Sequence, residues 1–106
     1  MEPLIVLVTA SSPEEAWRIA QALVDERLAA CVNVLPGVRP VYRWQGQMVT
    51  AGETLLIVKT TRDVLQALTA RVRALHSYTV PEVVAVPIVD GSPPYLDWLV
   101  EQVGKA

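Results

Sequence analysis

Four stretches of the sequence read as β-strands that have no polar face. They are Leu4–Val8, Cys31–Leu35, Leu55–Val58 and Val83–Val89. A strand that is half open to water alternates apolar and polar residues, whereas a strand buried on both faces is a continuous apolar run. A sheet made of these strands needs cover on two faces, and the sequence offers long helices for only one. We infer that another copy of the chain covers the second face.

Length and composition exclude several classes of protein. The 106 residues are expected to form one domain, 1–106. The net charge is −2 and the basic residues are scattered, so we expect no nucleic-acid partner. Because no apolar run approaches the roughly 20 residues that cross a bilayer, and the first residues lack the features of a signal peptide, we expect no membrane partner. A single cysteine cannot form an internal disulfide, which fits an intracellular, reducing location.

The order of the predicted elements indicates the fold. Reading along the chain, we expect a strand over Pro3–Ala10, a helix from Ser12-Pro13 to about Leu28, a strand from Ala30, a strand over Glu53–Thr60, a helix after Thr61, a strand over Val83–Val89, and a short C-terminal helix from Ser92-Pro93. Two right-handed crossovers place both long helices on one side of the sheet. The fold class is therefore predicted to be α+β, a ferredoxin-like βαββαβ sandwich.

Each helix carries an apolar stripe at helical spacing. In the first helix, Ser12 is the expected N-cap and Glu15 the capping-box residue. Thr61 is the expected cap of the second helix. The expected buried stripes are Trp17, Ala20, Leu23, Val24 and Leu28 in the first helix; Leu65, Leu68, Val72 and Leu75 in the second; and Tyr95, Trp98, Leu99 and Val103 in the last.

The segment between the second and third strands is expected to form an extended hairpin. Residues 41–49 alternate in polarity, which predicts Tyr42, Trp44 and Met48 on one face. The hairpin over Val41–Thr60 is expected to project beyond the other strands. An isolated two-stranded ribbon is weak, so its tip is predicted to pair with a neighbouring copy and to bury Trp44 there.

The apolar surplus supports an oligomer energetically. If about ten Val, Leu and Ile side chains lie on the uncovered face, leaving them wet forgoes roughly 1.5–3 kcal/mol each. The sum exceeds the net stability of a typical domain, so a bare monomer is expected to be sticky or marginal. A cyclic assembly of three or more copies and a two-fold dimer would both cover the face, and these arguments do not choose between them.

Signatures of catalysis are absent from the sequence. There is no glycine-rich phosphate loop, no Cys-x-x-Cys, no His-Glu-x-x-His and no Gly-x-Ser-x-Gly motif. Cys31 and His76 have no evident third residue that would orient a catalytic base. We therefore expect a protein that is not an enzyme and that uses no organic cofactor.

A few residues remain as candidates for a binding site. His76 is either a histidine that caps the second helix or a metal ligand, and it would need help from other side chains, most suitably for copper. Cys31 is either a small buried apolar residue or a ligand. Lys59 either ends its strand, pairs with Glu53 or Glu82, or receives an anion at the rim of the sheet. Glu82 itself is either a charge at a strand start or a pocket carboxylate.

The aromatic residues Tyr42, Trp44 and Tyr78 are either core and interface residues or stacking platforms. Together with neighbouring residues they form local strings that resemble one family, the CutA1 divalent-cation tolerance proteins. The strings are Ala29-Ala30-Cys31-Val32-Asn33, Pro36-Gly37, Tyr42-x-Trp44-x-Gly46, Glu53, Lys59-Thr60-Thr61, His76-x-Tyr78-x-x-Pro81-Glu82 and Tyr95-Leu96-x-Trp98-Leu99.

The resemblance implies a cytoplasmic homotrimer that is similar in architecture to PII signalling proteins, with hairpins wrapped between neighbours. It also implies a link with copper and other divalent metal ions. Copper ligands proposed in some relatives correspond here to Val8, Leu75 and His76, so only His76 remains and copper binding is expected to be weak. The positions of Cys31, Lys59, Tyr78 and Glu82 match motif residues and are expected to bind a ligand in a cleft between subunits.

Two functions follow from these features. The first is tolerance of or response to divalent metal ions, with weak binding near His76 and a carboxylate such as Glu82. The second is a PII-like sensor or adaptor that holds a small anionic ligand through Lys59 and acts on a protein partner that the sequence does not identify.

Overall fold

The computed structural model describes residues 1–104 and contains one four-stranded sheet, a small hairpin and three α-helices. The elements are β1 (Pro3–Ala10), α1 (Pro13–Asp25), β2 (Cys31–Val38), β3 (Tyr42–Trp44), β4 (Gln47–Val49), β5 (Glu53–Thr61), the 3₁₀ turn η1 (Arg62–Val64), α2 (Leu65–Leu75), β6 (Val83–Pro87) and α3 (Pro93–Gln102).

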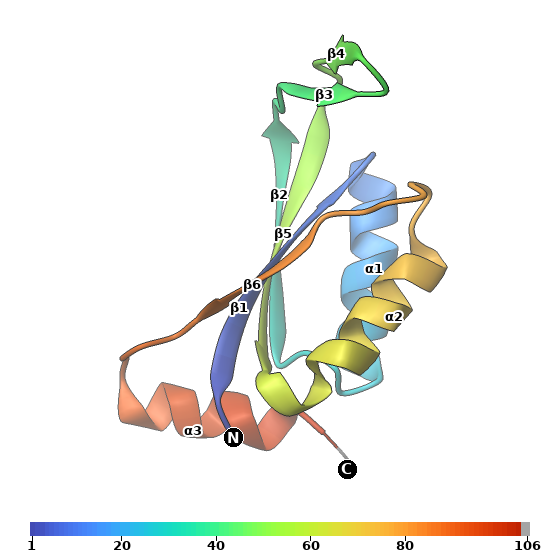
Figure 1. Cartoon of the computed structure of the whole chain (residues 1–106). Coiled ribbons are helices and arrows are strands. Elements are labelled where there is room, and N and C mark those ends of the chain that lie inside the picture. Colours follow the sequence, from blue (N-terminus) through green and yellow to red (C-terminus); the bar gives the residue numbers. More distant parts are fainter. Residues whose placement is uncertain (105–106) are drawn as a thin grey trace.

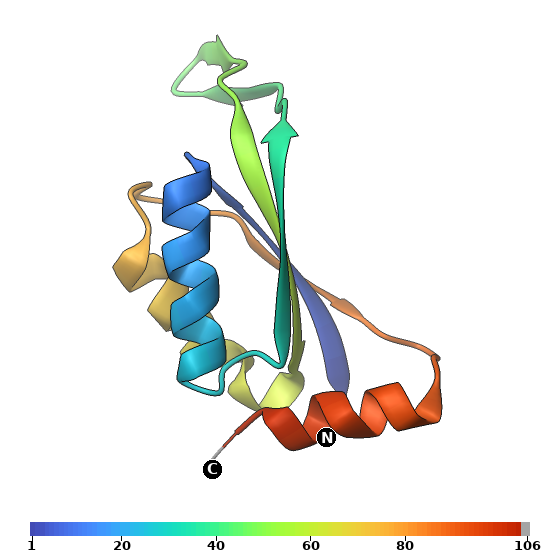
Figure 2. The same cartoon turned by 180° about the vertical axis from the view of Figure 1, so that it is seen from behind.

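The sheet has the strand order β2-β5-β1-β6, and every neighbouring pair is antiparallel. Both long helices, α1 and α2, lie on the same side of it, while α3 crosses one end of the sheet (Figures 1 and 2). This arrangement confirms the predicted α+β, ferredoxin-like sandwich.

The core fills the space between the sheet and the two long helices. Alternate residues of β1 and β5 face the helices because side chains of a strand point to opposite faces in turn. Val6 and Val8 of β1 meet Leu56 and Val58 of β5, and all four are fully buried with Leu23 of α1. Each such side chain stabilises the fold by roughly 1.5–3 kcal/mol.

Helix α1 begins as predicted and ends earlier than predicted. The backbone N–H of Glu15 donates to Ser12 Oγ at 3.1 Å, which is the expected N-cap. The helix stops at Asp25, because the backbone at Arg27 is left-handed (φ 60°) and cannot continue a right-handed helix. The placement of Trp17 and Val24 in the buried stripe was wrong: Trp17 is 58% exposed and Val24 44%.

The hairpin was predicted as one alternating segment, and the structure corrects this. Gln45 and Gly46 both have positive φ (50° and 78°), as a two-residue type I′ turn requires, so β3 and β4 pair with each other. Met48 therefore lies opposite Arg43 and does not share a face with Trp44. The hairpin extends beyond the end of the four-stranded sheet, as expected (Figure 1).

In the second half of the chain, the start of α2 and the end of β6 differ from the prediction. Thr61 does not cap α2: it precedes η1, and its side chain makes no capping hydrogen bond. Strand β6 ends at Pro87, which lacks the N–H needed to continue the ladder, so Val89 lies outside the strand and is 93% exposed. In α3, Leu99 and Val103 are buried as expected, whereas Tyr95 and Trp98 are partly exposed.

The sheet face opposite α1 and α2 is only partly covered by the chain itself. The register places Ile5 and Leu7 of β1, Ile57 of β5, and Val84 and Val86 of β6 on this face. Val84 and Val86 remain 49% and 45% exposed. We call this the open face; within residues 1–104, it is the surface that the apolar strand pattern predicted to need cover.

Candidate functional site

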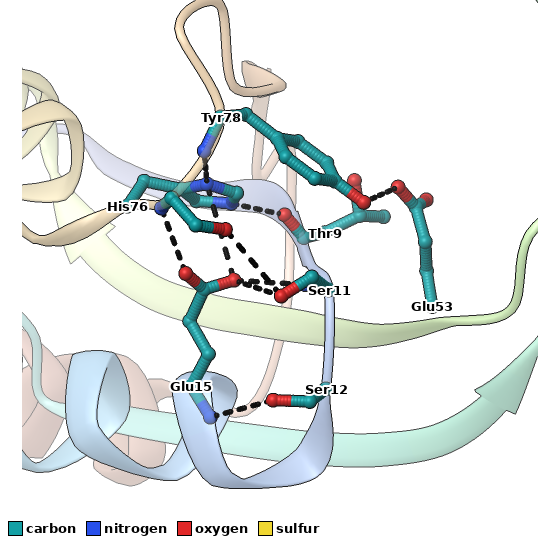
Figure 3. Close-up of polar contacts among 8 residues, drawn as sticks. Thr9, Ser11, Ser12, Glu15, Glu53, His76 and Tyr78 are labelled. Carbon is teal, nitrogen blue, oxygen red and sulfur yellow. Dashed lines mark hydrogen bonds and ion pairs between the residues drawn. The ribbon is translucent and has the colours of Figure 1, made fainter.

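Polar side chains gather where the segment after α2, residues 76–82, crosses the end of β1 and the start of α1 (Figure 3). The carboxylate of Glu15 is at its centre, and this residue is only 3% exposed. It accepts hydrogen bonds from the Ser11 N–H (2.8 Å), the Ser11 hydroxyl (2.9 Å) and the Ser77 N–H (2.7 Å). Both carboxylate oxygens are therefore bonded.

These bonds keep Glu15 ionised. Burial by itself raises the pKa of this carboxyl, but the hydrogen bonds from Ser11 and Ser77 outweigh burial and lower the pKa to about 2. An ionised carboxylate here ties the connector 76–82 to the start of α1. Its role is structural, because three hydrogen bonds from the protein engage both of its oxygens.

His76 is held just as completely. Its Nδ1 accepts a hydrogen bond from the Tyr78 N–H at 3.0 Å, so the proton is on Nε2, which donates to the Thr9 carbonyl oxygen at 2.7 Å. The imidazole is fully buried and lies 4.0 Å from the Glu15 carboxylate. With both nitrogens bonded to backbone groups, the ring offers no free lone pair.

A second carboxylate lies on the other side of Tyr78. The Tyr78 hydroxyl donates to Glu53 Oε2 at 2.8 Å, and its ring stacks obliquely on His76 with centroids 4.7 Å apart. Burial and the neighbouring Glu53 carboxylate raise the pKa of Tyr78. The phenol is therefore a permanent donor, and the negative charge stays on Glu53.

Tyr78 and Glu53 border a cleft between the hairpin and the connector. The cleft has a volume of about 830 Å³. Tyr42 and Trp44 line it from the hairpin, and Glu82 lines it from the end of the connector. A space of this size accommodates a small organic molecule.

Residues 4–102 match the family model of the CutA1 divalent ion tolerance protein. It belongs to the CutA1 family. The divalent-cation tolerance protein CutA of Thermus thermophilus is 57% identical over 100 residues, which cover 94% of this chain and 97% of that protein. A chloroplastic CutA of Arabidopsis thaliana is 47% identical over 96 residues, which cover 91% of this chain and 53% of the plant protein. The chain thus spans about half the length of that relative.

Solved CutA1 structures have the same fold. The Thermus thermophilus protein superposes with a TM-score of 0.94 at 56% identity, covering 96% of this chain and 99% of that chain. CutA1 of Oryza sativa superposes with a TM-score of 0.96 at 43% identity, covering 100% of this chain and 97% of that one. The predicted resemblance to CutA1 is confirmed.

The CutA1 fold brings the predicted site residues to two separate places. Tyr78 and Glu82 line the cleft, and His76 lies directly behind Tyr78. Cys31 and Lys59 sit opposite each other on the open face, with Lys59 Nζ 4.0 Å from Cys31 Sγ. Of the alternatives considered for Lys59, the structure favours none of the glutamate pairings within residues 1–104: its ammonium donates to the Asn33 side chain.

Lys59 and the cleft are far apart for a simple reason. Glu53 and Lys59 begin and nearly end the same strand, and six residues of strand span roughly 20 Å. No single ligand of ordinary size can contact Lys59 and the cleft residues of one chain. From the sequence, Glu53 was a possible partner of Lys59 and one of the residues that resemble CutA1 proteins, and it was not assigned to a site. Its signal was a carboxylate at the start of an otherwise apolar strand.

Within residues 1–104, no group of three or more His, Cys, Asp or Glu side chains is placed to hold a metal ion. His76 would have to give up its hydrogen bond from Tyr78 to expose a lone pair. The same part of the chain holds no helix that is long and apolar enough to cross a bilayer.

Proposed function

We propose that the protein acts in divalent-cation tolerance as a homotrimer assembled through the open face. The observation that carries this proposal is the half-exposed apolar face of the sheet, where Val84 and Val86 meet solvent in an isolated chain. Burying several such side chains stabilises an assembly by roughly 1.5–3 kcal/mol each before the costs of association. The hairpin beyond the sheet supplies further unpaired edges to a neighbour.

Light scattering tests the assembly. We expect a mass of about three times 11.6 kDa in dilute buffer. Val84→Lys places a charge on the open face and is expected to reduce the mass, whereas Val89→Lys changes an exposed valine outside the sheet and is expected to leave it unchanged. A well-behaved particle of one-chain mass would overturn the proposal, and a two-chain mass would retain the face but exclude the trimer.

We infer that divalent-ion binding by this trimer is weak and needs no contribution from His76. The names of the relatives support a divalent-cation role, and the bonded nitrogens of His76 argue against a ligand at that position. The copper role of His76 stays a prediction that the geometry does not favour. Calorimetric titration of Cu(II) and Zn(II) into wild type and His76→Gln is expected to give matching isotherms. Lost heat in a variant that remains folded and trimeric would assign the metal to His76.

We propose a binding role and not catalysis. Support comes from His76, whose nitrogens are committed to Thr9 and Tyr78 and cannot serve as a base. The PII-like alternative needs an anion at Lys59, which already bonds to Asn33 on the open face. The cytoplasmic location and an additional protein partner stay predictions. Relatives carry the words chloroplastic and periplasmic in their names, so no compartment is transferred from them.

A further inference from the structure

The cleft beside the hairpin combines aromatic walls with fixed negative charge. In the isolated chain Tyr42 and Trp44 are 39% and 45% exposed and line the cleft from β3. Tyr78 closes the opposite wall, because its hydroxyl is tied to Glu53. Aromatic faces carry a negative quadrupole and attract cations that come within about 6 Å of the ring centre.

Glu53 supplies a carboxylate oxygen that the protein leaves free. The residue is only 8% exposed, and within residues 1–104 its side chain has one hydrogen bond, from the Tyr78 hydroxyl to Oε2. Figure 3 shows the other oxygen without a partner. Within residues 1–104 that oxygen is not among the buried unpaired atoms, so it reaches solvent in the cleft and can bond to a ligand donor. A charged donor gives the strongest hydrogen bond.

The charged residues that line the cleft are both acidic. Glu53 and Glu82 line it, and none of its described lining residues is a lysine, arginine or histidine. This pattern repels anions and leaves two carboxylates to be compensated. It also separates the cleft from Lys59, which serves the open face.

The walls favour an organic cation over a bare metal ion. Magnesium and similar ions keep their water shells and need several oxygen ligands in a fixed geometry, which two carboxylates on different elements do not supply. An alkyl ammonium ion is larger and has an apolar body. It gains from ring faces, from burial of its methylene groups and from the carboxylates at the same time.

We propose that this cleft binds a small organic ammonium ion, with a diamine bridging Glu53 and Glu82 between the rings of Trp44 and Tyr78. One ammonium group donates to the free oxygen of Glu53. The methylene chain lies against the aromatic walls, and the second ammonium group lies at the exposed Glu82. The site is separate from any divalent-metal site and does not depend on His76 as a ligand.

Calorimetric titration of the full chain in low salt with 1,4-diaminobutane tests the proposal. We expect saturable binding with one diamine per chain, and no binding of butane-1,4-diol or succinate, which match its length without its charge. Salt is expected to weaken the binding because it screens the ammonium–carboxylate attraction. Equal binding of the diol would overturn the proposal, and so would displacement of the diamine by an equal concentration of Mg²⁺.

Matched variants locate the site. Glu53→Gln is expected to weaken diamine binding at least about tenfold, and Trp44→Ala about three- to tenfold. Trp17→Ala removes an exposed indole on α1, outside the cleft, and is expected to change nothing. Should Glu53→Gln fail to fold, the double variant Trp44→Ala, Glu82→Gln alters only exposed residues and carries the same test. Unchanged affinity in these variants would overturn the assignment.

Light scattering on the same samples keeps this proposal distinct from the proposed function. Diamine binding that is absent from an intact trimer removes the cleft proposal alone. A monomeric chain that still binds the diamine removes the trimer alone, because the residues invoked for the cleft belong to one chain.

Discussion

Two buried glutamates lie on either side of the connector 76–82, and they behave differently. Glu15 is 3% exposed and Glu53 is 8% exposed, so burial does not distinguish them. Glu15 accepts three hydrogen bonds that use both oxygens, whereas Glu53 accepts one, from Tyr78. One carboxylate is closed within the protein, and the other faces a cleft.

The difference teaches how to separate structure from binding in a cluster of polar residues. A fully bonded buried group stabilises one conformation and has nothing left to offer a ligand. A carboxylate whose spare oxygen reaches a cleft can exchange its bound water for a donor of a ligand. By this criterion, Glu15 and His76 hold the connector in place, and we call them the closed side of the cluster. Glu53 and Tyr78 can receive a ligand, and we call them the cleft side.

The largest expected effect comes from the closed side. Glu15→Gln exchanges an acceptor-only group for an amide whose NH₂ faces the donors of Ser11 and Ser77. We expect a loss of about 3 kcal/mol in the free energy of unfolding, measured by urea denaturation at fixed protein concentration. Glu14→Gln changes an exposed neighbour on the same turn and is expected to shift stability by less than about 0.5 kcal/mol. Similar losses in both variants would contradict the assigned role of Glu15.

The second prediction concerns pH and the same carboxylate. The folded-state pKa of Glu15, about 2, lies below its ordinary value of 4.5, so ionised Glu15 stabilises the fold fully above pH 4.5. This contribution is lost as the pH falls through the folded-state value. Between pH 7 and pH 3 the loss is about 2 kcal/mol. Wild type minus Glu15→Gln isolates it, and parallel acid profiles for the two proteins would exclude it.

Much of the closed side could be predicted from the sequence. Ser12-Pro13-Glu14-Glu15 has the pattern of a helix start, and the structure confirms the Ser12 cap. The partner of Glu15 was not foreseeable, because the capping-box pattern directs this side chain to Ser12, whereas the structure directs it to Ser11 and to Ser77, 62 residues away. Local chemistry predicted the cap, and tertiary packing chose the acceptor's partners.

The cleft side was harder to predict from the sequence, because it depends on how the hairpin is placed against the connector. The hydrogen bond between Tyr78 and Glu53 joins residues 25 positions apart. The cleft also requires the Gln45-Gly46 turn. This turn was not predicted, because the alternation of residues 41–49 indicated one continuous strand. The four apolar runs, by contrast, predicted the sheet and its open face, because a continuous apolar run indicates a strand buried on both faces without any knowledge of its neighbours.

The third prediction separates the two sides directly. Tyr78→Phe keeps the ring against His76 but removes the hydroxyl that holds Glu53. We expect a loss of about 1–1.5 kcal/mol in unfolding free energy, smaller than for Glu15→Gln because Glu53 still faces the cleft. Tyr95→Phe, on the exposed side of α3, is the control and is expected to be neutral. A loss as large as that of Glu15→Gln would show that Glu53 is as tightly bound within the protein as Glu15 is.

The smallest expected effect concerns a buried polar group that belongs to neither side. Thr61 is fully buried, and within residues 1–104 its hydroxyl has no hydrogen-bond partner and no cleft to face. Thr61→Val keeps the shape and removes the unpaired oxygen, so we expect a gain of about 0.5–1 kcal/mol in unfolding free energy. Thr60→Val is the matched control: its hydroxyl donates to the Leu28 carbonyl at 2.7 Å, so it is expected to destabilise. Destabilisation by Thr61→Val would contradict the assignment of this hydroxyl as a buried group without a partner.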